Sequence, residues 1–220
     1  MREEDILVVF SSGYIGSREE AQTLHKEWLS LEELYADFGL RFVVAPRCDD
    51  ADGVSRKGLW EYSELFRDFL LGQPRGRELV LVNFSAGGPI ADMGIIRARG
   101  SPKPKPRIAA TFYVEATHIG ISSGMVRRFN WPGSRFIDDL EPRSRFMEEV
   151  ARFRPAKPRN CVEVSGRFAE LFPITFGPRT ETELITLPEI THGELEYSWH
   201  VHFRIIMRIQ EILRRSRRTQ

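Results

Sequence analysis

Short runs of consecutive apolar residues alternate along the chain with longer stretches in which apolar residues recur every three or four positions. A short continuous run predicts a strand buried on both faces, and the longer spacing predicts a helix with one apolar face. The runs predict strands at 6–10, 40–46, 78–84, 108–116, 161–165 and 183–189. The spacing predicts helices at 18–38, 59–71, 86–99, 141–153 and 197–215. Because strands alternate with amphipathic helices, we expect an α/β fold, a three-layer α/β/α sandwich around a mostly parallel sheet.

Length and composition narrow the class of protein. The chain has 220 residues and no repeat at solenoid periods, so we expect a single domain over 1–220. Hydrophobic residues make up 41% and charged residues 29%, as in soluble globular proteins. The net charge of +1 gives no overall field that would attract nucleic acid. The basic end RRSRRTQ could contact an anionic surface, although a solvated, frayed helix end is the simpler interpretation.

The sequence lacks the usual marks of secretion, membrane insertion and metal binding. The acidic start MREEDILVVF differs from a signal peptide, and no apolar stretch approaches membrane-spanning length. We therefore expect a cytoplasmic protein without integral membrane contact. Cys48 and Cys161 have neither metal-ligand spacing nor a disulfide pattern. The acidic loop CDDADG does not fit a calcium loop, because Cys48 and Leu59 fall where the first and last ligands belong.

Residues that could carry chemistry follow the predicted strands. In an open parallel sheet, ligands bind beyond the carboxyl ends of the strands. The loops at those ends carry Gly13, Ser85, Glu115, His118 and His192. These loops are therefore the predicted location of a functional site.

Ser85 stands between a predicted strand and a predicted helix, in the run Asn83-Phe84-Ser85-Ala86-Gly87-Gly88. A nucleophilic serine needs exposure at a strand end, a base to accept its proton and donors for an oxyanion. Small residues after the serine permit a tight turn, and the N–H of Ala86 would face an oxyanion from the helix N-terminus. These six residues alone are equally compatible with a serine that only caps the helix.

Two segments resemble motifs of the α/β-hydrolase family, especially its lipase-like and esterase-like members. Asn83-Phe84-Ser85-Ala86-Gly87 resembles the nucleophile elbow G-x-S-x-G, with Asn83 in place of the first glycine. Residues 12–17, SGYIGS, resemble the family loop H-G-x-x-G-S that supplies the second oxyanion donor, with serine in place of histidine. The resemblance implies that the N–H of Gly13 or Tyr14 is that donor.

The histidines can be ranked by the same resemblance. FYVEATHIG at 112–120 is similar to a lipase segment that often ends T-P-H-x-G, whose histidine is not the base, so we expect His118 to be structural or to line the site. His192 follows the last strand and precedes a terminal amphipathic helix, which is where the family places the base. The resemblance therefore implies a catalytic serine and histidine at Ser85 and His192.

The acid of the triad stays open between two glutamates. The usual place in the family is the loop after the fifth strand, which here contains no aspartate but does contain Glu170. Some members place the acid after the preceding strand, where Glu115 stands. Glu170 is slightly favoured as the acid, because it stands in the loop where the family usually places it. Either carboxylate would fix the tautomer of His192 and stabilise its imidazolium.

The resemblance implies a serine hydrolase that cleaves carboxylic esters, thioesters or lipid-like acyl substrates through an acyl-enzyme, without a metal or organic cofactor. Residues 121–140 fall where the family often inserts a cap. Phe129 and Trp131, with Met125 and Phe136, could line an acyl pocket there, and packing on the sheet is at least as good an explanation.

Two alternatives remain. SSGYIGS also resembles the dinucleotide loop of short-chain dehydrogenases, but its first glycine is absent and no tyrosine is followed four residues later by lysine. The departures Ser12 and Asn83 and the missing aspartate also allow a non-catalytic binding or scaffold protein on a degenerate hydrolase fold.

Overall fold

The computed structural model describes residues 6–14, 17–45, 57–74, 76–118, 120–121, 135–153, 161–166 and 182–218. Within these ranges six strands form one parallel sheet in the order β2-β1-β3-β4-β5-β6. The strands are β1 Ile6–Ser11, β2 Leu40–Val44, β3 Glu78–Phe84, β4 Arg107–Val114, β5 Cys161–Ser165 and β6 Thr182–Thr186. All six predicted strands are confirmed. The last ends three residues early, where the proline at position 188 lacks the N–H that would continue the ladder.

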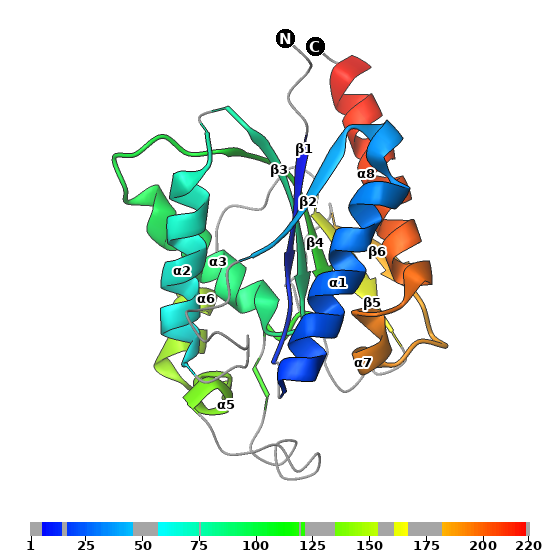
Figure 1. Ribbon diagram of the computed structural model, residues 1–220. Coiled ribbons are helices and arrows are strands. Elements are labelled where there is room, and N and C mark those ends of the chain that lie inside the picture. The colour runs from blue at the N-terminus through cyan, green and yellow to red at the C-terminus, as the bar shows by residue number, and fades with distance from the viewer. Residues whose placement is uncertain are drawn as a thin grey trace.

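Helices cover both faces of the sheet, as Figure 1 shows. They are α1 Arg18–Leu34, η1 Ala36–Phe38, α2 Leu59–Gly72, α3 Gly87–Arg99, α5 Arg135–Asp139, α6 Arg145–Phe153, α7 His192–Leu195 and α8 Trp199–Arg218. On one face lie α1 and α8, and on the other lie α2, α3 and α6. The expected α/β/α sandwich is therefore present. The short helix α5 lies within the segment 121–140, for which the sequence predicted no helix.

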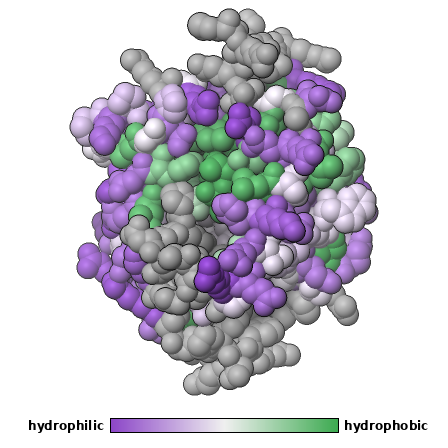
Figure 2. Space-filling model, in the orientation of Figure 1, coloured by the Kyte–Doolittle hydropathy of each residue, from purple (hydrophilic) through white to green (hydrophobic). Residues whose placement is uncertain are grey.

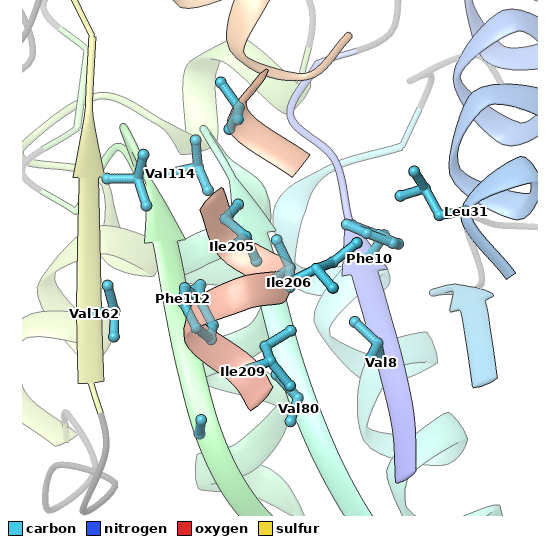
Figure 3. Packing of buried hydrophobic residues seen from close by; sticks show 14 of the residues in the cluster. Val8, Phe10, Leu31, Val80, Phe112, Val114, Val162, Ile205, Ile206 and Ile209 are labelled. Carbon is cyan, nitrogen blue, oxygen red and sulfur yellow. The ribbon is translucent and has the colours of Figure 1, made fainter. Parts of the chain in front are cut away.

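The core lies on both sides of the sheet because alternate residues of each strand point to opposite faces. Val8 and Phe10 face α1 and α8, whereas Leu7 and Val9 face α2 and α3. Figure 3 shows how Ile205, Ile206 and Ile209 of α8 pack over the central strands on the first face. Burying one such side chain contributes about 1.5–3 kcal/mol, so the terminal helix is a main part of the core.

Aromatic rings fill the space between α1 and the sheet. Phe10 stacks on Trp28 with ring centroids 4.7 Å apart, and Trp28 stacks on Phe84 at 5.3 Å. Phe10 is the last residue but one of β1, and Phe84 is the last residue of β3. The two strands that lead to Gly13 and Ser85 are thus fixed by one buried aromatic cluster.

The face toward the viewer in Figures 1 and 2 is the side of edge strand β2. Figure 2 shows apolar residues gathered across its middle, over this strand and between α1 and α2. Val43 and Val44 of β2 are accordingly only partly buried. Among the helices in the described ranges, none is long and apolar enough to cross a membrane.

His202 of α8 is buried beside the aromatic cluster, and its Nε2 lies 2.9 Å from the carbonyl oxygen of Glu196. Burial lowers the pKa of His202 to about 4. An unfolded histidine has a pKa near 6.5, so protonation favours the unfolded chain between these values. The stability that neutral His202 contributes is complete above pH ~6.5 and is lost as the pH falls towards ~4.

We therefore expect wild-type protein to lose about 3 kcal/mol more of its free energy of unfolding between pH 7 and pH 4 than His202→Gln loses. Glutamine keeps a donor for the Glu196 carbonyl and does not titrate. Urea denaturation of both proteins at the two pH values measures the difference. An equal loss in both would show that His202 does not carry this pH dependence.

Candidate active site

Ser85 occupies a strained turn between β3 and α3. Its φ of 47° lies in the left-handed region, which costs a non-glycine residue on the order of 1–3 kcal/mol. Backbone hydrogen bonds to the neighbouring strand hold it there. The N–H of Ser85 donates to the carbonyl of Val114 at 3.0 Å, and the Ser85 carbonyl accepts from the N–H of Thr117 at 3.1 Å. Such strain, held by the surrounding structure, is typical of functional positions.

Glycines make the tight turn sterically possible. A Cβ on Gly87 would collide with the carbonyl oxygen of Ser11, and a Cβ on Gly88 would lie 2.5 Å from the Cβ of Ala116. A Cβ on Gly13 would lie 2.6 Å from the Cβ of Ser85. The loop after β1 therefore packs directly on the serine.

His192 and Glu115 complete a chain of contacts with Ser85. The Nε2 of His192 lies 3.1 Å from the Oγ of Ser85, and the Nδ1 lies 2.5 Å from the Oε2 of Glu115. His192 begins α7, where Thr191 and Glu194 form a capping box. With Nδ1–H donated to the carboxylate, Nε2 is the ring nitrogen that faces the serine hydroxyl as an acceptor. The three residues therefore have the geometry of a nucleophile, a base and an orienting acid.

Glu115 is fully buried and is held on both sides. Its other carboxylate oxygen, Oε1, accepts the N–H of Gly166 at 2.6 Å. Its φ is 40°, so it is a second residue in the left-handed region. The N–H of Glu115 donates to the carbonyl of Val164 at 2.8 Å. The residue that follows β4 is thus fixed by β5, in an orientation that presents one oxygen to His192.

Two of the residues predicted to supply oxyanion donors, Gly13 and Ala86, lie beside Ser85. Ala86 precedes the first turn of α3, and the Cβ position on Gly13 is 3.5 Å from the Ala86 nitrogen. The N–H of Gly13 itself donates to Oε1 of Glu196 at 2.9 Å. The ring of Tyr14 packs edge-on against Phe136, with centroids 5.4 Å apart. One of the two candidate N–H groups in the loop after β1 is therefore already donated to a carboxylate.

Glu196 was not predicted from the sequence. Its carboxylate binds the loop after β1, and its carbonyl accepts the indole N–H of Trp28 at 3.0 Å as well as contacting His202. It therefore ties the loop after β1 to the segment that carries His192. The only sequence signal was its position four residues after His192, which does not by itself distinguish it from other glutamates of that segment.

His118 lies behind the turn, in a buried polar cluster. Its Nε2 is 3.1 Å from Oδ2 of Asp92, whose Oδ1 accepts the hydroxyl of Tyr113 at 2.5 Å. The His118 ring also packs edge-on against Tyr113, with centroids 4.8 Å apart, and Gly88 approaches it closely. We retain the interpretation of His118 as structural or site-lining. Asp92 was not predicted, although an acid on an otherwise apolar helix face is a signal.

Asn83, the departure from the family elbow, is fully buried. Neither its side-chain oxygen nor its nitrogen has a hydrogen-bond partner in the described part of the protein. It stands two residues after Leu81 in β3, so its side chain points to the same face of the sheet, the one covered by α2 and α3. The turn accommodates it despite the cost of burying an unpaired amide.

Several predicted residues lie outside the described ranges: Glu170, Phe129, Trp131 and most of the segment 121–140. Cys48 also lies outside them. No group of three or more His, Cys, Asp or Glu side chains that could hold a metal ion occurs among the residues that were described.

Comparison with known proteins supports the fold. No protein-family model and no curated protein matches the chain. The mature lipase BlEst2 of Bacillus licheniformis aligns with a TM-score of 0.59 and 14% identity, over 94% of this chain and 92% of that one. RedJ, solved with a polyethylene glycol molecule in its active site, aligns with a TM-score of 0.57 and 15% identity. The alignment covers 94% of this chain and 92% of RedJ. A pyrethroid hydrolase from Sphingobium faniae JZ-2 aligns with a TM-score of 0.51 and 14% identity. The alignment covers 94% of this chain and 97% of that one. The chain therefore has the α/β-hydrolase fold.

Proposed function

We propose that this protein is a serine hydrolase that cleaves carboxylic esters, thioesters or lipid-like acyl substrates through an acyl-enzyme. The observation that carries the proposal is the continuous contact from Ser85 through His192 to buried Glu115. Three residues from three different loops meet in the order and orientation that nucleophilic catalysis requires. The names of the structural neighbours, a lipase and a pyrethroid hydrolase among them, agree with this class of reaction.

Ser85, His192 and Glu115 have different roles in the proposed reaction. Ser85 attacks the acyl carbon while His192 takes the hydroxyl proton, and His192 then gives that proton to the leaving group. Water, activated by His192, hydrolyses the acyl-enzyme. Glu115 keeps Nδ1–H of His192 oriented and stabilises the imidazolium. Gly13 packs closely against Ser85. This contact favours a role of the loop after β1 in holding the oxyanion over a role in binding a dinucleotide.

The oxyanion would be held by two backbone N–H groups. Ala86 supplies one from the N-terminus of α3. Of the two candidates in the loop after β1, we propose Tyr14, because the N–H of Gly13 is already donated to Glu196. Each such donor contributes about 2.7–4 kcal/mol to stabilising the transition state.

Labelling with a fluorophosphonate probe tests the proposal. We expect one adduct per chain, mapped to Ser85 by mass spectrometry, because only an activated serine reacts at neutral pH. Ser85→Ala should abolish the adduct, and Ser198→Ala, a half-buried serine near the base, should retain it. If the native protein gives no adduct, or an adduct elsewhere, a binding or scaffold role on a hydrolase fold replaces the proposal.

The acyl-pocket prediction concerns residues outside the described ranges, so it is tested by kinetics alone. If Phe129 and Trp131 line the pocket, Phe129→Ala and Trp131→Ala should each shift the preferred chain length of p-nitrophenyl esters. One buried methylene is worth about 0.8 kcal/mol, or roughly a fourfold change in kcat/KM. An unchanged profile in both variants would mean that these rings only pack on the sheet.

A further inference from the structure

Helix α8 carries apolar side chains on the face that does not pack on the sheet. Trp199, Phe203 and Met207 are 70%, 42% and 44% exposed. Their spacing of four residues places them on one side of the helix, over about 12 Å of its length. We call these three residues the α8 stripe. The apolar residues that bury α8 against the sheet, such as Ile205 and Ile209, occupy the other side.

Arginines lie along α8, beside the α8 stripe and beyond its C-terminal end. Arg204 and Arg214 are exposed, and neither forms an ion pair within the described part of the chain. Arg208 and Arg215 pair with Glu211, and Arg208 also pairs with Glu183. In sequence α8 contains six arginines and one acid, a net charge of +5. Since the whole chain has a charge of +1, the remainder has a charge of −4, and the positive charge is concentrated on this helix.

The size and composition of this face fit a lipid surface better than a protein. A stable protein interface covers about 800 Å² on each partner, more than three partly exposed side chains provide. A bilayer surface accepts a small apolar stripe by shallow insertion, and tryptophan is favoured at the level of the headgroups. Arginines beside such a stripe are attracted to anionic headgroups.

We propose that the outer face of α8, the α8 stripe with Arg204 and Arg214, docks the protein on membrane surfaces rich in anionic phospholipid. Trp199 lies seven residues after His192, at the end of α8 that is nearer the base in sequence. Docking would therefore bring the active-site edge of the sheet close to the lipid. This inference goes beyond the serine hydrolase proposal and does not depend on it.

Sedimentation with vesicles tests the docking. The full chain carrying Ser85→Ala is used, so that no turnover affects binding. Vesicles contain phosphatidylcholine alone, or phosphatidylcholine with an equal amount of phosphatidylglycerol. We expect binding to the anionic vesicles only, and a loss of about tenfold or more in partitioning for Trp199→Ser/Phe203→Ser and for Arg204→Gln/Arg214→Gln.

Matched controls change the same chemistry elsewhere. Leu34→Ser removes a side chain that is also 70% exposed, on α1. Arg99→Gln/Arg143→Gln removes two exposed arginines near α3 and α6, on the other side of the sheet. Both controls should bind as the parent does.

Three results would overturn the proposal. The first is no binding of the parent to anionic vesicles, and the second is an equal loss in the controls. The third is a dimer, detected by light scattering without lipid, that Trp199→Ser/Phe203→Ser dissociates, because the α8 stripe would then contact a second copy. Labelling of Ser85 by the fluorophosphonate probe is measured separately, so failure of docking and failure of the proposed activity can be distinguished.

Discussion

His192→Ala is expected to lower kcat for a p-nitrophenyl ester by on the order of 10⁴- to 10⁶-fold, with little change in KM. Nε2 of His192 is 3.1 Å from the Ser85 hydroxyl, so its loss would leave the proposed nucleophile without its proposed base. Substrate contacts made before proton transfer are retained, which is why KM should stay nearly constant. Steady-state kinetics near neutral pH measures both constants.

His200→Ala provides the matched control. His200 is an exposed histidine on α8, packed edge-on against Trp199, and it is not among the hydrogen-bond partners of Ser85, His192 and Glu115 within the described residues. We expect its kcat to stay within about twofold of wild type, since surface substitutions away from such contacts change little. Thermal unfolding of both variants shows whether each is folded at the assay temperature, because His192→Ala also removes a partner of the buried Glu115 carboxylate. A loss below about tenfold in His192→Ala would mean that Ser85 is not activated by this histidine.

Much of the fold follows from the alternation of apolar runs and amphipathic helices. In a layered α/β protein a continuous apolar run such as 78–84 indicates a central strand, because both faces of such a strand are covered by helices. Helix ends were less predictable. The first helix ends at Leu34 and not at residue 38, and residues 36–38 form a separate 3-10 turn. Periodicity continues through that break, so the pattern alone does not reveal it.

The relation between Ser85 and Glu115 depends on register, which the sequence does not specify. Phe84 and Val114 are paired across β3 and β4, so the residues that follow them lie side by side. Both then turn into the left-handed region, and each is held by a hydrogen bond to the next strand. The sequence left Glu115 and Glu170 open because each follows one of two neighbouring strands.

Contacts between distant segments were the part that sequence reasoning missed. Glu196 binds Gly13 across 183 positions, and Asp92 binds His118 across 26. A glutamate in a helical segment and an aspartate on a helix are ordinary in sequence. Only the packing of α3 and α7 against the strand ends gives them partners. Supporting residues of a site are therefore harder to predict than the residues that react.

Glu115→Gln should lower kcat by on the order of 10⁴-fold, while Glu170→Gln should leave it nearly unchanged. The Gly166 N–H donates to Oε1 of Glu115, so the oxygen of a glutamine amide must occupy that position. Its NH₂ group then faces Nδ1 of His192, in place of the oxygen at 2.5 Å. That donor stabilises the tautomer with the proton on Nε2, which is unable to accept the proton of Ser85.

The two substitutions are sterically equal, so kinetics on the same ester separates the two candidate acids. A pH profile of kcat/KM adds a second measurement. In Glu115→Gln the remaining activity should rise further with pH, because the histidine loses the carboxylate that assists it and hydroxide begins to replace the base. If Glu170→Gln is the damaging variant instead, the carboxylate that contacts His192 in the resting enzyme is not the one that supports catalysis. Glu115 would then serve only to hold β4, β5 and α7 together through Gly166 and His192.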